Sequence, residues 1–134
     1  MDVIRVVVAD DQLPFRRAAR AVLGALPDFE LVAEVASGEE AVDAATSLEP
    51  ELVLMDMHMD GIGGVEATRR IVAEHPDAVV VLVSSYRAEE LEAAVTESGA
   101  AAFLPKEQFG AAALKDLWSS LARPRARRGT RGQP

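Results

Sequence analysis

Three acidic side chains stand out because each of them follows a short apolar run. Asp10 and Asp11 come directly after the run at residues 3–9, and Asp56 comes directly after the run at residues 52–55. Continuous apolar runs of this length are typical of strands buried in a parallel sheet, and ligand sites in such sheets lie at the carboxyl ends of the strands. The sequence therefore predicts an acidic cluster at one edge of a parallel sheet.

Three ionised carboxylates within a few ångströms of one another would not all stay ionised without a compensating charge. At about 4 Å and an effective dielectric constant near 20, each like-charged pair repels by roughly 4 kcal/mol. Either one carboxyl keeps its proton, or a divalent cation lies among them. Mg²⁺ suits the second case, because it prefers oxygen ligands and is commonly held by one or two carboxylates plus a substrate phosphate. If Asp11 and Asp56 hold Mg²⁺ directly and Asp10 acts through water, one oxygen of Asp56 remains free as a nucleophile toward phosphorus.

Two later residues have side chains that could stabilise the charge on a transferred phosphoryl group. Ser84 ends the apolar run at residues 79–84, and Lys106 follows the run at residues 101–104. Both are therefore expected at the same sheet edge as Asp56. There the lysine can bind phosphate as a point charge, and the serine hydroxyl can donate a hydrogen bond.

Short β-branched runs alternate with longer segments of helical period, which is typical of an α/β fold built on a parallel sheet. Strands are predicted at residues 3–9, 31–36, 52–56, 79–84 and 101–104. Apolar spacing and flanking prolines predict helices at about 14–26, 37–49, 64–74, 87–98 and 110–121.

Several residues at or near helix ends have expected roles. Ser37 and Glu40 form a predicted capping box at the start of the second helix. Gly99 is predicted to cap the end of the fourth helix. Trp118, on the apolar face of the fifth helix, is predicted to pack in the core.

The composition indicates one domain, expected to span residues 1–122 of the 134. The chain has no cysteine, which excludes a disulfide framework and a thiolate metal site. No apolar run approaches the length that spans a bilayer, and the acidic N-terminus is unlike a secretory signal. We expect a cytoplasmic protein without a membrane partner.

The charge is distributed unevenly along the chain. The net charge is −8, yet residues 1–122 hold nine basic and twenty-two acidic side chains, a balance of −13. Such a body should repel nucleic acid. The remaining residues, 123–134, contain five arginines and lack apolar periodicity, so a disordered arginine-rich tail is predicted.

These residues, in this order, closely resemble the site of the receiver domain of two-component response regulators. The resemblance covers about residues 3–122. It implies the CheY-like fold, a five-stranded parallel sheet in the flavodoxin-like order 2-1-3-4-5 with five helices on both faces. The matching residues are Asp10 and Asp11 after the first strand, Asp56 after the third, Ser84 after the fourth and Lys106 after the fifth.

The resemblance also implies the parts that the acidic residues play. Asp56 would accept a phosphoryl group from a sensor histidine kinase or a phosphotransfer protein. Mg²⁺ would be held by Asp11, by Asp56 and by the backbone carbonyl of His58, with Asp10 acting through water. Lys106 would pair with the phosphate.

Further implications concern the conformational response. Ser84 resembles the switch hydroxyl that moves toward the new phosphoryl group, and Phe103 resembles the aromatic residue that follows it inward. The fourth helix, fifth strand and fifth helix would then contact an output partner or a second copy of the chain. Such a domain is not an enzyme, apart from accepting a phosphoryl group and losing it again.

The sequence departs from the usual receiver pattern at several positions. Asp60 stands where proline is common, and Glu107 follows Lys106 where proline is usual, so a trans peptide bond is expected there. His58 and Tyr86 flank the expected path of attacking water, and we hypothesise that their bulk slows the loss of phosphate. Residues 56–71 look most like receivers that precede a LuxR-type helix-turn-helix, which leaves a stand-alone receiver and a truncated DNA-binding regulator both open.

Two other functions remain as alternatives. One is a magnesium-dependent phosphatase with an aspartyl nucleophile, of the haloacid-dehalogenase type. That family usually has a second aspartate two positions after the nucleophile, where this chain has His58. The other is a receiver-like module that binds a partner without phosphorylation, an alternative that Asp60 leaves open.

Overall fold

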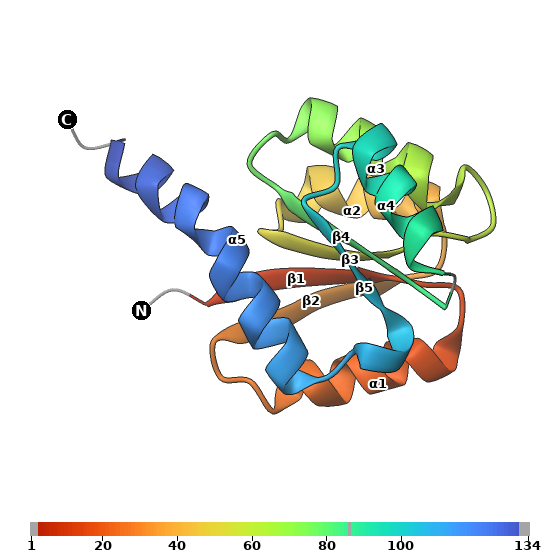
Figure 1. Cartoon of the computed structure of the whole chain (residues 1–134), viewed down its shortest axis with the longest axis horizontal. Helices are drawn as coiled ribbons and strands as arrows, with labels where there is room; N and C mark the ends of the chain where they lie inside the picture. Colours follow the sequence, from red (N-terminus) through yellow and green to blue (C-terminus); the bar gives the residue numbers. More distant parts are fainter. Residues whose placement is uncertain (1–2, 86, 132–134) are drawn as a thin grey trace.

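A five-stranded parallel sheet forms the centre of the molecule (Figure 1). The computed structural model describes residues 3–85 and 87–131, without the side chains at positions 88 and 122–131. The strand order is β2-β1-β3-β4-β5, which confirms the predicted topology. The strands are β1 (Ile4–Ala9), β2 (Phe29–Val35), β3 (Leu52–Asp56), β4 (Val79–Ser84) and β5 (Ala102–Pro105).

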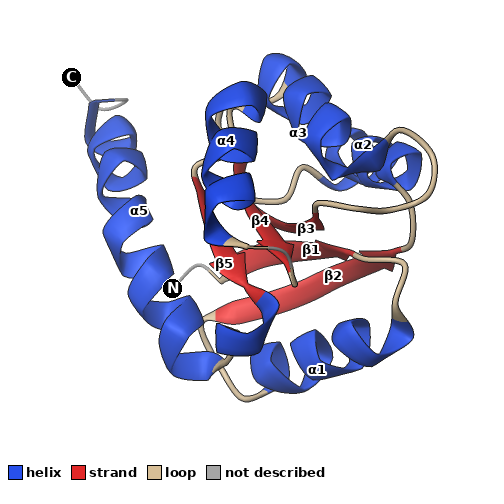
Figure 2. Ribbon diagram, turned by 45° about the vertical axis from the view of Figure 1, so that its right-hand side comes forward, coloured by secondary structure: helices blue, strands red, loops and turns tan. Residues whose placement is uncertain are grey.

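Helices cover both faces of this sheet, as the sequence predicts (Figure 2). Helices α1 and α5 pack on one face, and α2, α3 and α4 pack on the other. A short 3₁₀ helix, η1 (Lys106–Gln108), connects β5 to α5. The α-helices are α1 (Leu13–Gly24), α2 (Gly38–Leu48), α3 (Gly63–Glu74), α4 (Ala88–Ser98) and α5 (Ala111–Arg131).

The central strands are buried on both sides, which explains why they are continuous apolar runs. Successive residues of β1 point to opposite faces, so Val7 packs toward α2 and α3 whereas Val6 and Val8 pack toward α1 and α5. The same alternation places Val53 and Leu54 of β3 in different halves of the core. The carboxyl ends of these strands are thereby fixed at one edge of the sheet.

The helix ends follow local sequence chemistry. Ser37 Oγ accepts a hydrogen bond from the Glu40 backbone N–H at 3.2 Å, which confirms its role as N-cap of α2. The Glu40 carboxylate accepts from the Ala36 backbone N–H at 2.8 Å, so it reaches one residue further back than the predicted capping box. Gly99 has a φ of 85° and ends α4, as predicted.

One strand boundary, the start of β2, differs slightly from expectation. Strand β2 begins at Phe29 rather than Leu31, and the buried Phe29 ring packs against Trp118 in a T-shaped pair with centroids 6.2 Å apart. Trp118 is therefore a packing residue, as predicted. All described peptide bonds are trans, including the one between Lys106 and Glu107.

The fifth helix is longer than the sequence predicts. We expected it to end near Leu121 and residues 123–134 to form a disordered tail, whereas helical backbone continues to Arg131 (Figure 1). Alanine and arginine are strong helix formers, and Pro124 is the one residue in this stretch that strongly opposes a helix. The domain boundary after residue 122 stays a prediction. No described helix combines the length and apolar character that a membrane span requires.

Candidate functional site

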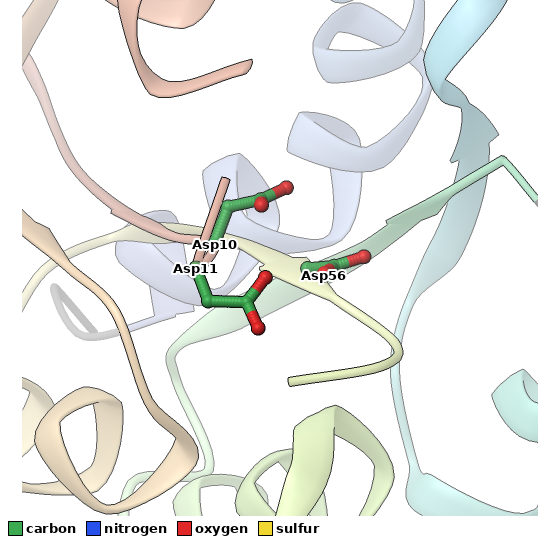
Figure 3. Close-up of side chains that lie close together, drawn as sticks. All are labelled: Asp10, Asp11 and Asp56. Atoms are coloured by element: carbon green, nitrogen blue, oxygen red, sulfur yellow. The ribbon is translucent and has the colours of Figure 1, made fainter. Parts of the chain in front are cut away.

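Three carboxylates meet at the carboxyl edge of the sheet (Figure 3). Asp10 follows β1 and Asp56 ends β3, and these strands are neighbours in which Ala9 is paired with Met55. One carboxylate oxygen from each of Asp10, Asp11 and Asp56 lies within 4.8 Å of the others. The acidic cluster that the sequence predicts is therefore present in the structure.

The three carboxylates differ in their exposure to solvent. Asp10 is fully buried, Asp56 is 5% exposed, and Asp11 is exposed. Asp10 Oδ1 accepts a hydrogen bond from the Gln12 backbone N–H at 2.8 Å. The site thus has two buried acids with one exposed acid at its mouth, so a ligand would approach from the side of Asp11.

Lys106 supplies the positive charge of the site. It begins η1 directly after β5, and its Nζ lies 2.7 Å from Asp10 Oδ2 and 3.6 Å from Asp56 Oδ1. Its side chain is 13% exposed. The lysine is therefore a largely buried counter-ion that is closer to Asp10 than to Asp56, at the sheet edge where the sequence places it.

The pKa of the Asp56 carboxyl is raised from 3.8 to about 6, first by burial and then by the negative charge of Asp10. The charge of Lys106 and a hydrogen bond from the His58 backbone N–H lower this pKa, while Asp11 adds a smaller upward contribution. The combined result is a carboxylate that is costly to charge without a cation. Such a perturbed acid is typical of a functional site.

Ser84 completes the edge from the next strand. It is the last residue of β4 and is buried, with 1% of its surface exposed. In the sheet Asp56 is paired with Val83, and Ser84 is paired with Pro105, the residue before Lys106. Ser84 is therefore placed between the strand that ends in Asp56 and the strand that leads to Lys106.

The loop after Asp56 is bonded to β4 at its start and then returns to the end of β3. The Met57 backbone N–H donates to the Val83 carbonyl at 3.1 Å, and the Gly64 N–H donates to the Met57 carbonyl at 3.0 Å. A Cβ at Gly64 would lie 2.0 Å from the backbone oxygen of Asp56. The sequence shows a glycine-rich stretch here, but only the structure shows that Gly64 is required for this close approach. His58 and Asp60 are exposed on the loop.

Phe103 is half-buried on β5. It lines a surface groove of about 400 Å³ between α4 and β5, together with Val95 and Ala102. The structure thus leaves part of this ring accessible from the α4 side. Tyr86, the other aromatic residue singled out from the sequence, lies outside the described residues.

Two residues near the start of α1 also contact the lysine, and sequence reasoning missed both. Lys106 Nζ donates a hydrogen bond to Gln12 Oε1 at 3.4 Å and lies 4.9 Å from the centroid of the Phe15 ring. Their one sequence signal is that they closely follow Asp10 and Asp11. Nothing in that spacing identifies Lys106, 94 positions after Gln12, as their partner.

The donor set fits Mg²⁺. It consists of carboxylate oxygens from Asp10, Asp11 and Asp56, which are the hard ligands that this ion prefers. Burial, and after it the charge of Asp10, raises the pKa of Asp56, so its ionised form is unfavourable without a cation. Within residues 3–85 and 87–131, no other group of three potential metal-ligating side chains is gathered in this way.

Comparison with known proteins agrees with this geometry. The sequence model of the response regulator receiver domain matches residues 6–117. The chain belongs to the response regulator receiver domain family. It is the kind of domain found in two-component signalling systems, and phosphorylation and Mg²⁺ binding are typical of the family.

Relatives of this receiver domain include longer regulators. It is 36% identical over 104 residues to the transcriptional regulatory protein DegU of Brevibacillus brevis, covering 78% of this chain and 44% of DegU. It is 38% identical over 103 residues to the response regulator GacA of Pseudomonas viridiflava, covering 77% of this chain and 48% of GacA. The chain therefore spans about half the length of these relatives.

Solved structures show the same fold. A LuxR-family two-component response regulator from Aurantimonas sp. SI85-9A1 superposes with a TM-score of 0.81 at 26% identity. The match covers 90% of this receiver domain and 86% of that chain. The expected similarity to receivers that precede a LuxR-type helix-turn-helix is thereby confirmed.

Proposed function

We propose that Asp56 accepts a phosphoryl group from a phosphohistidine on a sensor kinase or phosphotransfer protein. The observation that carries this proposal is the gathering of three carboxylates and Lys106 around a nearly buried acid of raised pKa. In the transfer, an oxygen of Asp56 forms a bond to phosphorus while the bond from phosphorus to the imidazole nitrogen breaks. The electron pair of that bond returns to the imidazole nitrogen, and because the other ring nitrogen of the phosphohistidine carries a proton, the donor leaves as a neutral histidine.

The neighbours of each carboxylate favour Asp56 over the other two as the acceptor. Asp10 is fully buried, and its two oxygens face the Lys106 amine at 2.7 Å and the Gln12 N–H at 2.8 Å. Asp11 is exposed, so water competes with any partner it binds. Asp56 is nearly buried, and its Oδ1 lies 3.6 Å from the amine without a close ion pair, so a phosphoryl group bonded to Asp56 would be within reach of the lysine.

A bound Mg²⁺ would be held by Asp11, by Asp56 and by the backbone carbonyl of His58, with Asp10 acting through water. When bound, it would neutralise the carboxylates and the phosphoryl oxygens. Lys106 supplies a second positive charge from the start of η1, on a different element from the metal ligands. Charge on the transferred group is then balanced from two directions.

The conformational response is proposed to use Ser84 and Phe103. Phosphorylation of Asp56 exchanges one negative charge for about two and adds acceptor oxygens. The Ser84 hydroxyl, at the end of the adjacent strand, would donate to one of them, and Phe103 would turn from the groove beside α4 toward the space that Ser84 vacates. These contacts bias an existing equilibrium between two conformations.

The output surface is proposed to comprise α4, β5 and α5, which would contact an output domain, a partner protein or a second copy of the chain. The groove lined by Phe103 opens on this surface, so a change at Phe103 alters what the partner meets. The acidic body of residues 1–122 makes DNA contact by this domain itself unfavourable. In this proposal the domain itself is not an enzyme, apart from gaining and losing a phosphoryl group at Asp56.

Further proposals concern the surroundings of the domain. The receiver would occupy residues 1–122 and act in the cytoplasm, and the arginine-rich residues 123–134 would extend beyond it along the helical backbone that reaches Arg131. His58 and Tyr86 would slow the loss of phosphate by obstructing attacking water. His58 is exposed on the loop after Asp56, a position from which its ring can shield that residue.

Incubation with Mg²⁺ and phosphoramidate, a small phosphodonor, tests the proposed function. Intact-mass measurement should find one phosphoryl group per wild-type chain and none on Asp56→Asn. Asp60→Asn is the matched control, because it removes an exposed carboxylate from the same loop, and it should be modified like the wild type. Sustained turnover of the donor would instead favour the phosphatase, and no modification would favour the binding module.

A further inference from the structure

The N-cap position of α1 is occupied by an unusual residue that does not cap. Gln12 has the extended backbone expected of an N-cap, with φ −100° and ψ 112°, but its side chain makes no hydrogen bond to the helix. Ser, Thr, Asp and Asn are preferred there because their short side chains reach the free backbone N–H groups of the first turn. A residue that breaks a local rule is often one that serves a site.

The Gln12 side chain instead extends to the candidate site. Its Oε1 accepts a hydrogen bond from Lys106 Nζ at 3.4 Å. The same amine is 2.7 Å from Asp10 Oδ2 and 3.6 Å from Asp56 Oδ1. Gln12 is thus a neutral acceptor that engages the amine without adding to the charge of the acidic cluster.

Phe15, on the first turn of the same helix, supports the amine from another direction. Lys106 Nζ lies 4.9 Å from its ring centroid, within the roughly 6 Å over which a cation is attracted to an aromatic face. The Phe15 ring is buried and contacts the Phe109 ring, with centroids 5.1 Å apart. Because Phe109 directly follows η1, this aromatic pair joins the start of α1 to the segment that carries the lysine.

These contacts matter because lysine has a long and flexible side chain. Without lateral contacts, its amine would sample many rotamers, and fixing it during a reaction would cost conformational entropy. Groups that are already ordered before the reaction avoid this cost. Gln12 and Phe15 restrict the Lys106 amine to the side of the site that faces Asp56.

We propose that Gln12 and Phe15 are positioning residues that hold the Lys106 amine where it meets the incoming phosphoryl group. Neither residue touches that group itself. The inference rests on the proposed function of Asp56 and extends the site to the first turn of α1. The chemistry at that turn is a neutral hydrogen-bond acceptor and an aromatic face, both directed at one cation.

The test is the rate of phosphorylation by phosphoramidate in saturating Mg²⁺. Gln12→Met keeps the length of the side chain and removes the amide oxygen, and it should slow the reaction about two- to fivefold, the effect of one lost hydrogen bond. Gln108→Met is the matched control, because Gln108 is an exposed glutamine of η1, and it should react like the wild type. Phe15→Leu keeps an apolar side chain without the aromatic face and should also slow the reaction.

Mg²⁺ affinity, measured by calorimetry, separates positioning from a general disturbance. A distorted start of α1 would displace Asp11 and weaken Mg²⁺ binding, whereas loss of lysine positioning leaves it unchanged. The inference is supported if the Gln12→Met variant is phosphorylated more slowly than the wild type and binds Mg²⁺ with the same affinity. An unchanged rate, or a slower rate with weakened Mg²⁺ binding, overturns it. A wild-type chain that takes up no phosphoryl group would instead refute the proposed function itself, so the two failures are distinguishable.

Discussion

Asp56→Asn should stabilise the metal-free domain, although it removes the residue at the centre of the site. Burial, together with the charges of Asp10 and Asp11, raises the pKa of this carboxyl to about 6. The ionised form is therefore less favourable in the folded protein than in the unfolded chain. Asparagine has nearly the same shape as the neutral acid and never carries the charge.

The magnitude follows from the change in pKa. The shift from 3.8 to about 6 corresponds to about 3 kcal/mol of lost stability at pH 8, where Asp56 is ionised in both states. Between about pH 4 and 6 the folded state binds more protons than the unfolded state, so the free energy of unfolding falls as pH rises through this window. The cost that Asp56 imposes is about half as large at pH 5 and is mostly absent near pH 4.

Urea unfolding in the presence of a chelator measures this effect. At pH 8 Asp56→Asn should have the higher free energy of unfolding, and the difference from the wild type should shrink on lowering the pH to 5. Adding Mg²⁺ should stabilise the wild type more than the variant. Asp60→Asn, at an exposed position of the same loop, serves as the control and should change stability little. Equal stabilities at pH 8, or a difference that does not depend on pH, would refute the reasoning.

Three further predictions concern other residues of the site and its support. Gly64→Ala should destabilise the domain by about 1–3 kcal/mol in thermal or urea unfolding, because the new Cβ would meet the Asp56 carbonyl, whereas Gly24→Ala, with open space around it, should not. Thr68→Val should raise the free energy of unfolding by about 1 kcal/mol, since the buried Thr68 hydroxyl has no hydrogen-bond partner among the described residues; an unchanged urea midpoint would contradict this. Lys106→Met should raise the pKa of the Asp56 carboxyl further in the presence of a chelator, because the charge of the lysine lowers this pKa in the wild type. Carbon NMR of the Asp56 carboxyl as a function of pH measures the pKa, and an equal or lower pKa in the variant would contradict the prediction.

The fold could be predicted from the sequence because strands and helices each have a distinct local pattern of apolar residues. The buried strands β1, β3 and β4 are continuous apolar runs, and the helices carry one apolar face each. The ends of strands and helices were harder to predict where residues distant in the sequence contact them. Strand β2 starts at Phe29, which is paired with Ile4 and packs against Trp118, and no local pattern reveals these contacts.

The acidic part of the site could be predicted from the sequence for a geometric reason. Parallel strands end at a common edge, so residues that follow their apolar runs must gather there. Asp10, Asp56, Ser84 and Lys106 are all placed by this rule. Burial could not be predicted in the same way: Asp10 and Asp11 are adjacent in sequence, yet one is fully buried and the other exposed.

The contacts that the sequence did not predict are those between side chains from distant segments. Neither Gln12 nor Phe15 was singled out from the sequence as a site residue, and both contact Lys106 in the fold. The role of Gly64 likewise depends on how closely the loop returns to Asp56. The helical backbone to Arg131 differs from expectation because Ala and Arg favour helix while the charge pattern suggested a tail.

The central claim is that the phosphoryl group is carried by Asp56 and by no other acid of the cluster. The direct measurement is to phosphorylate the chain with phosphoramidate and Mg²⁺, reduce the acyl phosphate with borohydride, and map the resulting homoserine by peptide mass spectrometry. The account predicts homoserine at position 56 alone. Homoserine at position 10 or 11, or an unmodified peptide containing residue 56 from a phosphorylated chain, would contradict it.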